Sequence, residues 1–284
     1  MKKKPMFISS YGRRLFLQKP IVMGVLNVTP DSFSDGGKYA NPRKAVEKAL
    51  AMVEEGVDII DIGGESTGPD SKNVSVAEEL SRVMPVILEL RAKTKSWLSI
   101  DTYKADVAVE ALEAGVDMVN DVTALRGDPK MGKLLAGYDV PVVLMYSKDP
   151  TPRTTRKAVA YRDVVSTVKR FLSDRIKVAI HCGIQKERLV VDPGMGAFLS
   201  LNPKYSLQVI RRLSELQSFH CPVLVGPSRK SFIGQVLNLP LHERVEGTLA
   251  ACVVAVMNGA SILRVHDVKE TRRVVDMVHA IIHS

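Results

Sequence analysis

The sequence contains little cysteine and lacks any long apolar run. Its three cysteines, Cys182, Cys221 and Cys252, are scattered and do not have the spacing of a metal site. We therefore expect free thiols in a reducing cytoplasm. No run of about eighteen apolar residues is present, and the start MKKKPMFISSYGRRLF has no apolar stretch before a cleavage site. We expect neither a membrane span nor a secretory signal.

The charge balance is basic, with a formal net charge of +9. Such a balance suits an anionic partner. The basic residues are spread along the chain and no basic motif is interleaved with aromatics, which favours a small anionic molecule over nucleic acid. The 284 residues, 45% of them hydrophobic, suffice for one large barrel or two small domains.

Eight apolar, β-branched runs alternate with segments of helical pattern. Continuous apolar strands indicate a parallel sheet buried on both faces, and eight β-then-α repeats favour closure into a barrel. An open doubly wound sheet is the alternative, but its usual G-x-G-x-x-G turn is missing after the first run. The sequence thus predicts an α/β fold, a single-domain (β/α)₈ TIM barrel over residues 21–284, with residues 1–20 forming an extension or hairpin across its bottom. The expected strands are residues 21–28, 57–63, 97–101, 118–122, 141–145, 189–192, 222–226 and 262–266, and expected helices include 42–55, 76–92 and 241–257.

Glycines stand where several helices should stop, just before the next strand. They are Gly56, Gly115 and Gly259. This places the amino ends of the strands at one rim and leaves the opposite rim for chemistry.

Polar residues end seven of the eight predicted strands. Any one of them could be a structural hydrogen-bonding group, but seven together are hard to explain as packing, because unpaired buried polar groups are costly. Asp101, Asn120 and Asp192 suit a flat, nitrogen-rich heterocycle with an amino-pyrimidine edge. Arg264 and His266, with Thr67 and Asn27, suit a diphosphate with Mg²⁺.

These motifs together resemble dihydropteroate synthase. The first signature is residues 24–37, GVLNVTPDSFSDGG, and the later ones follow in order from residue 61 to residue 267. They are Asp61–Thr67 (DIGGEST), Asn120-Asp121, Asp192-Pro193-Gly194, SRKSFIG from Ser228 and Arg264-Val265-His266-Asp267.

The resemblance implies a pterin-binding enzyme of folate biosynthesis. It would join (7,8-dihydropterin-6-yl)methyl diphosphate to para-aminobenzoate in an SN1-like reaction that releases diphosphate, with Mg²⁺ present. By matched position the implied roles are pterin binding by Asp101, Asn120, Met145, Asp192 and Lys230; diphosphate binding by Thr67, Arg264 and His266; para-aminobenzoate binding by Phe33, Pro69 and Ser231; the metal at Asn27; and catalysis by Asp31 and Lys230.

Two loops and one strand end depart from the family pattern. Gly68 replaces an arginine and Asp70 a glycine; Ala197 and Leu199 replace a phenylalanine and a lysine; Tyr146 follows Met145 where histidine is usual. Residues 192–200 resemble the plasmid-borne, sulfonamide-resistant branch, which suggests the hypothesis that the chain tolerates sulfonamides. Inhibition by sulfamethoxazole at concentrations that inhibit ordinary members would contradict it. Lys204 is a candidate to replace the missing cation.

Two other functions stay open at this point. One is a pterin-binding, corrinoid-dependent methyltransferase, which should lack the SRKS and Arg264-Val265-His266 motifs. The other is a non-catalytic pterin-binding module. The resemblance also implies a homodimer, through apolar helix faces in residues 253–257 and 274–282, and a cytoplasmic location.

Overall fold

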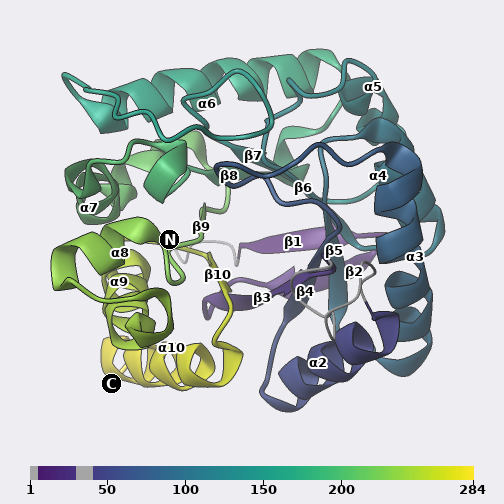
Figure 1. Cartoon of the computed structure of the whole chain (residues 1–284), viewed down its shortest axis with the longest axis horizontal. Coiled ribbons are helices and arrows are strands. Elements are labelled where there is room, and N and C mark those ends of the chain that lie inside the picture. The colour runs from purple at the N-terminus through teal and green to yellow at the C-terminus, as the bar shows by residue number, and fades with distance from the viewer. Residues whose placement is uncertain (1–5, 30–40) are drawn as a thin grey trace.

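Eight parallel strands form a nearly closed barrel surrounded by helices. The computed structural model describes residues 6–29 and 41–284, and within them the strand order is β8-β7-β6-β5-β4-β3-β10-β9. A bridge between Val191 and Val223 joins the two outer strands. In Figure 1 the helices follow one another around the strands in chain order. The predicted (β/α)₈ barrel is confirmed.

The strands lie close to their predicted positions. They are β3 (Ile21–Asn27), β4 (Ile59–Gly63), β5 (Trp97–Asp101), β6 (Met118–Asp121), β7 (Val142–Met145), β8 (Leu189–Asp192), β9 (Leu224–Val225) and β10 (Ile262–Val265). The largest differences are at β4 and β9. The amide of Val57 bonds to Met52 O at the end of the preceding helix, so β4 begins two residues later than expected.

The principal helices pack around the barrel. They are α2 (Pro42–Glu54), α3 (Val76–Lys93), α4 (Ala105–Glu113), α5 (Met131–Ala136), α6 (Val164–His181), α7 (Pro203–Arg211), α8 (Ser231–Leu237), α9 (Val245–Met257) and α10 (Val268–Ile282). The expected helix over 241–257 is wrong at its start, because residues Leu241–Glu243 form a separate 3₁₀ turn. None of the helices among the described residues is both long and apolar enough to cross a membrane.

Glycines end three of these helices as predicted. Gly56, Gly115 and Gly259 have φ of +87°, +91° and +95°. These left-handed values are costly for side chains with a Cβ but not for glycine. Each glycine therefore turns the chain from a helix end into the next strand at the same rim of the barrel.

The lower half of the barrel interior is apolar. Its side chains come from all eight strands and pack with Ile8 of an amino-terminal hairpin, β1 (Phe7–Ser10) paired with β2 (Arg13–Phe16). They are Ile21, Met23, Ile59, Trp97, Met118, Val143, Val190, Leu224 and Ile262. Side chains of a strand alternate between its faces, so the residue two positions further along points inward again.

That next inward layer is where the polar residues lie. Two positions beyond the apolar layer come Asp61 on β4, Asn120 on β6, Asp192 on β8 and Arg264 on β10. Asp101, one inward position higher on β5, pairs in register with Asn120. The alternation of each strand therefore gathers these polar groups at the carboxyl rim of the barrel.

Candidate active site

Arg264 lies at the centre of the polar layer and joins two carboxylates. Its Nε donates to Asp61 Oδ2 at 2.6 Å, and its Nη2 donates to Asp101 Oδ2 at 2.6 Å. Burial disfavours the charge of the guanidinium, but Asp61 and Asp101 raise the pKa of Arg264 above its usual value. Arg264 is therefore a permanent cation inside the barrel mouth.

Asp61, Asp101 and Asn120 form one continuous polar edge. The amide Nδ2 of Asn120 donates to Asp61 Oδ2 at 3.0 Å. The other oxygen of Asp61, Oδ1, is buried and has no hydrogen-bond partner among the described residues. Burial raises the pKa of Asp101 to about 7, although Arg264 opposes the shift. A buried acceptor without a donor is costly, so this edge suits a ligand that supplies N–H groups.

Asp192 and Lys230 are oppositely charged groups that influence each other's pKa. Asp192 Oδ1 accepts from the amide of Gly194 at 2.7 Å. Burial raises the pKa of Asp192 to about 6, with Lys230 opposing it. Burial lowers the pKa of Lys230 to about 8, with Asp192 opposing that shift. Both groups are strongly desolvated, which is typical of residues that bind or act on a substrate.

His266 and Ser228 face each other at the ends of β10 and β9. Ser228 Oγ lies 3.0 Å from His266 Nδ1 and accepts from the His266 amide at 3.1 Å. Removal from water, then Arg264 and Lys48, lower the pKa of His266 to about 4. The imidazole is therefore neutral at pH 7, while part of it is exposed at the barrel mouth.

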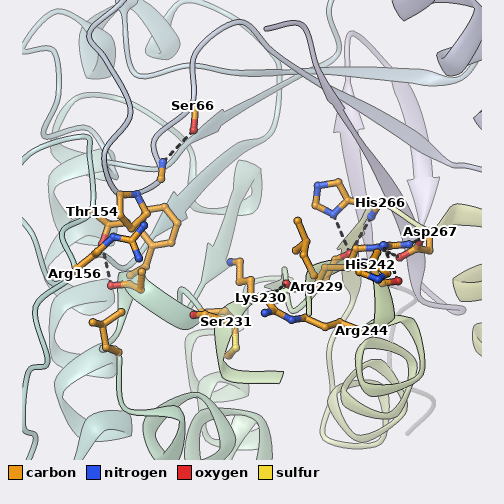
Figure 2. Close-up of a pocket in the computed structure, with 18 of the residues that line it drawn as sticks. Ser66, Thr154, Arg156, Arg229, Lys230, Ser231, His242, Arg244, His266 and Asp267 are labelled. Carbon is orange, nitrogen blue, oxygen red and sulfur yellow. Dashed lines mark hydrogen bonds and ion pairs between the residues drawn. The ribbon is translucent and has the colours of Figure 1, made fainter. Parts of the chain in front are cut away.

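Ser228, Lys230 and His266 are among the residues that line a cavity of about 1070 Å³. Figure 2 shows Lys230 and Ser231 between two walls, with His266, Asp267 and Arg229 on one side and Ser66, Thr154 and Arg156 on the other. Arg229 is bound by Asp267, with Nε to Oδ2 at 2.9 Å. The cavity is also lined by Gly68, Pro69, Met195, Ala197, Phe198 and Leu201.

Ion pairs and hydrogen bonds hold the loop that carries Thr67 and Pro69. Glu65, at its start, forms buried ion pairs with Lys104 at 2.5 Å and with Arg153. Lys104 also bonds to Glu79 at 2.5 Å and to Val74 O at 2.7 Å. The loop between β4 and α3 is therefore fastened to the barrel on both sides of Thr67.

Two of the positions that depart from the family pattern, Leu199 and Tyr146, are buried. Leu199 is fully buried in the apolar core, so its side chain does not reach the cavity, whereas Ala197 and Phe198 line it. Tyr146 is buried too, and its hydroxyl lies 3.2 Å from that of Tyr161, which donates to Leu199 O at 2.6 Å. The two tyrosines thus support the segment that carries Leu199.

Lys204 lies outside the cavity in this structure. It is exposed at the start of α7 and is not among the residues that line the cavity. Asn202 caps α7 by accepting from the amide of Lys204 at 3.0 Å.

The structure brings most of the predicted site residues to one rim of the barrel. Lys230, Ser231, Pro69 and His266 line the cavity. The deeper layer holds Asp101, Asn120, Asp192, Arg264 and Met145, which pairs in register with Asp192. Asn27 is exposed at the end of β3, and Thr67, half-buried, accepts through its carbonyl from Thr154. Asp31 and Phe33 lie outside the described residues.

The structure gives Asp61, Ser228 and Asp121 positions that their motifs alone do not specify. Asp61 had been noted only as part of a motif, but it binds both Arg264 and Asn120; the signal was its inward register on β4. Ser228 positions His266. Asp121 points to the adjoining loop instead, where it accepts from the amides of Thr123 at 2.8 Å and Leu125 at 2.7 Å.

Comparison with known proteins agrees with this arrangement. Residues 23–266 match the family described as pterin binding enzyme. The chain is 44% identical over 275 residues to dihydropteroate synthase of Escherichia coli (strain K12), covering 97% of this chain and 96% of that protein. The chain belongs to the dihydropteroate synthases. The corrinoid-dependent methyltransferase alternative is thereby set aside.

Solved dihydropteroate synthases share the fold over the whole chain. The Xanthomonas albilineans dihydropteroate synthase with 4-aminobenzoic acid is 43% identical, with a TM-score of 0.92 over 99% of this chain and 100% of that one. The same enzyme in complex with 7,8-dihydropteroate is 42% identical, with a TM-score of 0.87 over 98% and 99%. The family membership makes this protein a transferase of folate biosynthesis.

Proposed function

We propose that the chain joins (7,8-dihydropterin-6-yl)methyl diphosphate to para-aminobenzoate, giving 7,8-dihydropteroate and diphosphate. The observation that carries the proposal is the pairing of buried acceptors with a buried cation. Asp61, Asp101 and Asp192 supply carboxylate oxygens inside the barrel mouth, and Arg264 bonds to the first two. A substrate whose ring carries several N–H donors matches the carboxylates, and its diphosphate tail matches Arg264.

The pterin ring occupies the acceptor edge in this proposal. Asp192 accepts from the amino-pyrimidine N–H groups, and Asp101 and Asn120 contact the rest of the ring. Lys230, whose pKa is about 8, donates to a ring acceptor. Met145, buried beside Asp192 in the adjoining strand, supplies an apolar surface for the ring. These contacts fix the ring plane and, with it, the methylene that reacts.

The diphosphate leaves toward Arg264 and His266. The C–O bond loosens first, and the electron pair of that bond stays with the diphosphate. Arg264 stabilises the departing charge, and neutral His266 donates one ring N–H. Thr67 lies on the neighbouring loop and adds a hydroxyl donor. The pterin ring spreads the positive charge of the methylene carbon until the arylamine nitrogen attacks it and loses a proton to solvent.

The Mg²⁺ implied by the resemblance fits the donor set near Asn27. No group of three His, Cys, Asp or Glu side chains that could hold a metal occurs in residues 6–29 and 41–284. The exposed amide of Asn27, at the end of β3, supplies an oxygen, and Mg²⁺ commonly takes its remaining ligands from water and substrate phosphate. When bound there, Mg²⁺ would neutralise charge on the diphosphate.

The para-aminobenzoate enters above the pterin, between Pro69 and Ser231. Both residues line the cavity, and Ser231 begins α8. Asp31 and Phe33, which lie outside the described residues, are assigned to this end of the site by the family resemblance. In the proposal, Asp31 stabilises the cationic intermediate and helps to exclude water.

The proposal is tested by measuring diphosphate release while each component is omitted in turn. Release should require the pterin diphosphate, para-aminobenzoate and Mg²⁺ together. Tight pterin binding without turnover would instead indicate a non-catalytic pterin-binding module.

A homodimer in the cytoplasm is also proposed. Its support is the row of exposed apolar side chains on α9 and α10, including Val254, Met257, Met277 and Ile281, which are 42–67% exposed. Sedimentation equilibrium should give twice the chain mass. A monomer at all concentrations used in the assay would contradict the dimer.

A further inference from the structure

The cation Arg156 lies on the cavity wall opposite His266, which belongs to the proposed diphosphate site. It lines the cavity together with Thr154 and Ser66, while His266 and Arg229 are on the other side of Lys230 and Ser231 (Figure 2). Its side chain is 69% exposed. Arg156 belongs to the long segment between β7 and α6, which supplies none of the substrate contacts proposed above.

The backbone on both sides of Arg156 is fixed. The Thr154 amide donates to Thr67 O at 3.1 Å, and the Thr154 hydroxyl donates to Ala197 O at 2.8 Å. Further along, the Val159 amide donates to Ser200 Oγ at 3.0 Å. These bonds attach the segment to the two loops that form this wall. The backbone of Arg156 is therefore held at the rim, while its guanidinium remains in contact with solvent.

The carboxylate partner of Arg156 is equally exposed. Arg156 Nε donates to Asp70 Oδ2 at 2.7 Å, and the Asp70 side chain is 71% exposed. Exposed ion pairs contribute little to stability, because both charges are well solvated when apart. A ligand carboxylate can consequently replace Asp70 at small cost.

The surroundings of Arg156 match a benzoate. Pro69, Ala197, Phe198 and Leu201 line the same cavity as Arg156 and offer apolar surface for an arene. A planar guanidinium binds a carboxylate through two parallel hydrogen bonds. His266, which the proposal assigns to the diphosphate, lies on the opposite wall (Figure 2). We propose that Arg156 binds the carboxylate of para-aminobenzoate, in exchange for Asp70, and so selects a carboxylate-bearing arylamine. This inference rests on the proposed function.

The test compares para-aminobenzoate with 4-aminobenzamide, a neutral arylamine of nearly the same shape, as substrates of the full-length protein. In Arg156→Gln the KM for para-aminobenzoate should rise about tenfold, since a charge-assisted bond is lost, while the KM for 4-aminobenzamide changes by less than about twofold. Asp70→Asn should lower the KM for para-aminobenzoate, because it removes the competing charge and keeps the residue size. The KM for the pterin diphosphate should stay the same in both variants.

A matched control and a rescue sharpen the experiment. Lys157→Gln removes the adjacent exposed cation, which does not line the cavity, and should leave both KM values unchanged. Gly68→Arg in the Arg156→Gln background should restore part of the preference. Gly68 lines the same wall, and a Cβ there would meet only Ser66 Oγ, at 3.5 Å.

Equal changes for the two arylamines, or an unchanged KM for para-aminobenzoate in Arg156→Gln, would overturn the inference while leaving the proposed function intact. Absence of turnover by the wild type would overturn both.

Discussion

The guanidinium of Arg264 donates to the carboxylate of Asp101 across 2.6 Å. The two residues belong to opposite halves of the proposed substrate: Asp101 to the pterin and Arg264 to the diphosphate. In this structure Arg264 bonds to both Asp101 and Asp61. Binding therefore exchanges an internal ion pair for two contacts with the ligand.

This exchange predicts that the pterin and diphosphate ends bind cooperatively. Inorganic diphosphate draws Arg264 away from Asp101 and leaves that carboxylate free to accept from the ring. The Kd of 6-hydroxymethyl-7,8-dihydropterin, measured by calorimetry, should fall about tenfold with saturating diphosphate and Mg²⁺, and the reverse titration should show the same factor. Asp101→Asn should abolish most of the coupling. Equal affinities with and without diphosphate would refute the exchange.

Asp192 is predicted to contribute most to pterin affinity. Asp192→Ala should weaken pterin binding by about 2–4 kcal/mol, because ring N–H groups remain unpaired in a buried pocket. His266→Ala serves as the control, since it leaves the ring contacts in place. Titration calorimetry with the hydroxymethylpterin measures both. Comparable pterin affinity in the two variants would place the ring elsewhere.

Pterin binding should also depend on pH in a characteristic range. The carboxylates must be ionised to accept N–H bonds, and burial raises the pKa of Asp192 to about 6 and that of Asp101 to about 7. Each is ionised above its pKa, so affinity should decline as the pH falls from 7 through 6. Ordinary carboxylates would produce this decline near pH 4. Kd values from pH 5 to 8 decide between the two.

His266 is predicted to act as a neutral donor. Its pKa is lowered to about 4, so its protonation state is constant between pH 6 and 8. His266→Ala should reduce kcat/KM for the pterin diphosphate by about tenfold, with the same factor at both ends of this range. Ser228→Ala, which removes the hydroxyl beside Nδ1, should give a smaller loss. A loss that appears only at acidic pH would mean that the imidazolium is the active form.

Lys104 is predicted to matter for stability far more than an exposed lysine. Lys104→Met leaves Glu65 and Glu79 buried without this cation and should lower the free energy of unfolding by about 3–5 kcal/mol. Lys93→Met removes an exposed pair with Glu89 and should cost less than about 1 kcal/mol. Urea denaturation of both variants provides the comparison. Similar losses would show that the buried cluster is not what holds the loop.

The barrel and much of its site could be predicted from local sequence patterns. Apolar runs identify strands that are buried on both faces, and Gly56, Gly115 and Gly259 mark the helix ends. Because the carboxyl ends of parallel strands share one rim, Asp101, Asn120, Asp192 and Arg264 were expected to lie together. The structure places all four at the carboxyl ends of the strands inside the barrel mouth.

What escaped the sequence depends on contacts between distant segments. The bond from Arg264 to Asp61 joins residues 203 positions apart, and the pair of Arg156 with Asp70 joins residues 86 apart. Leu199 stands where the family pattern has a lysine, and the fold buries its side chain in the core. No spacing rule contains this information, because it arises from how the loops pack on one another.

The most direct test of the central claim is product formation by the purified protein. Mixed with the pterin diphosphate, para-aminobenzoate and Mg²⁺, the wild type should form dihydropteroate and diphosphate in equal amounts, and Asp192→Ala should form far less of both. Diphosphate release without dihydropteroate, or equal yields from the two proteins, would contradict the account.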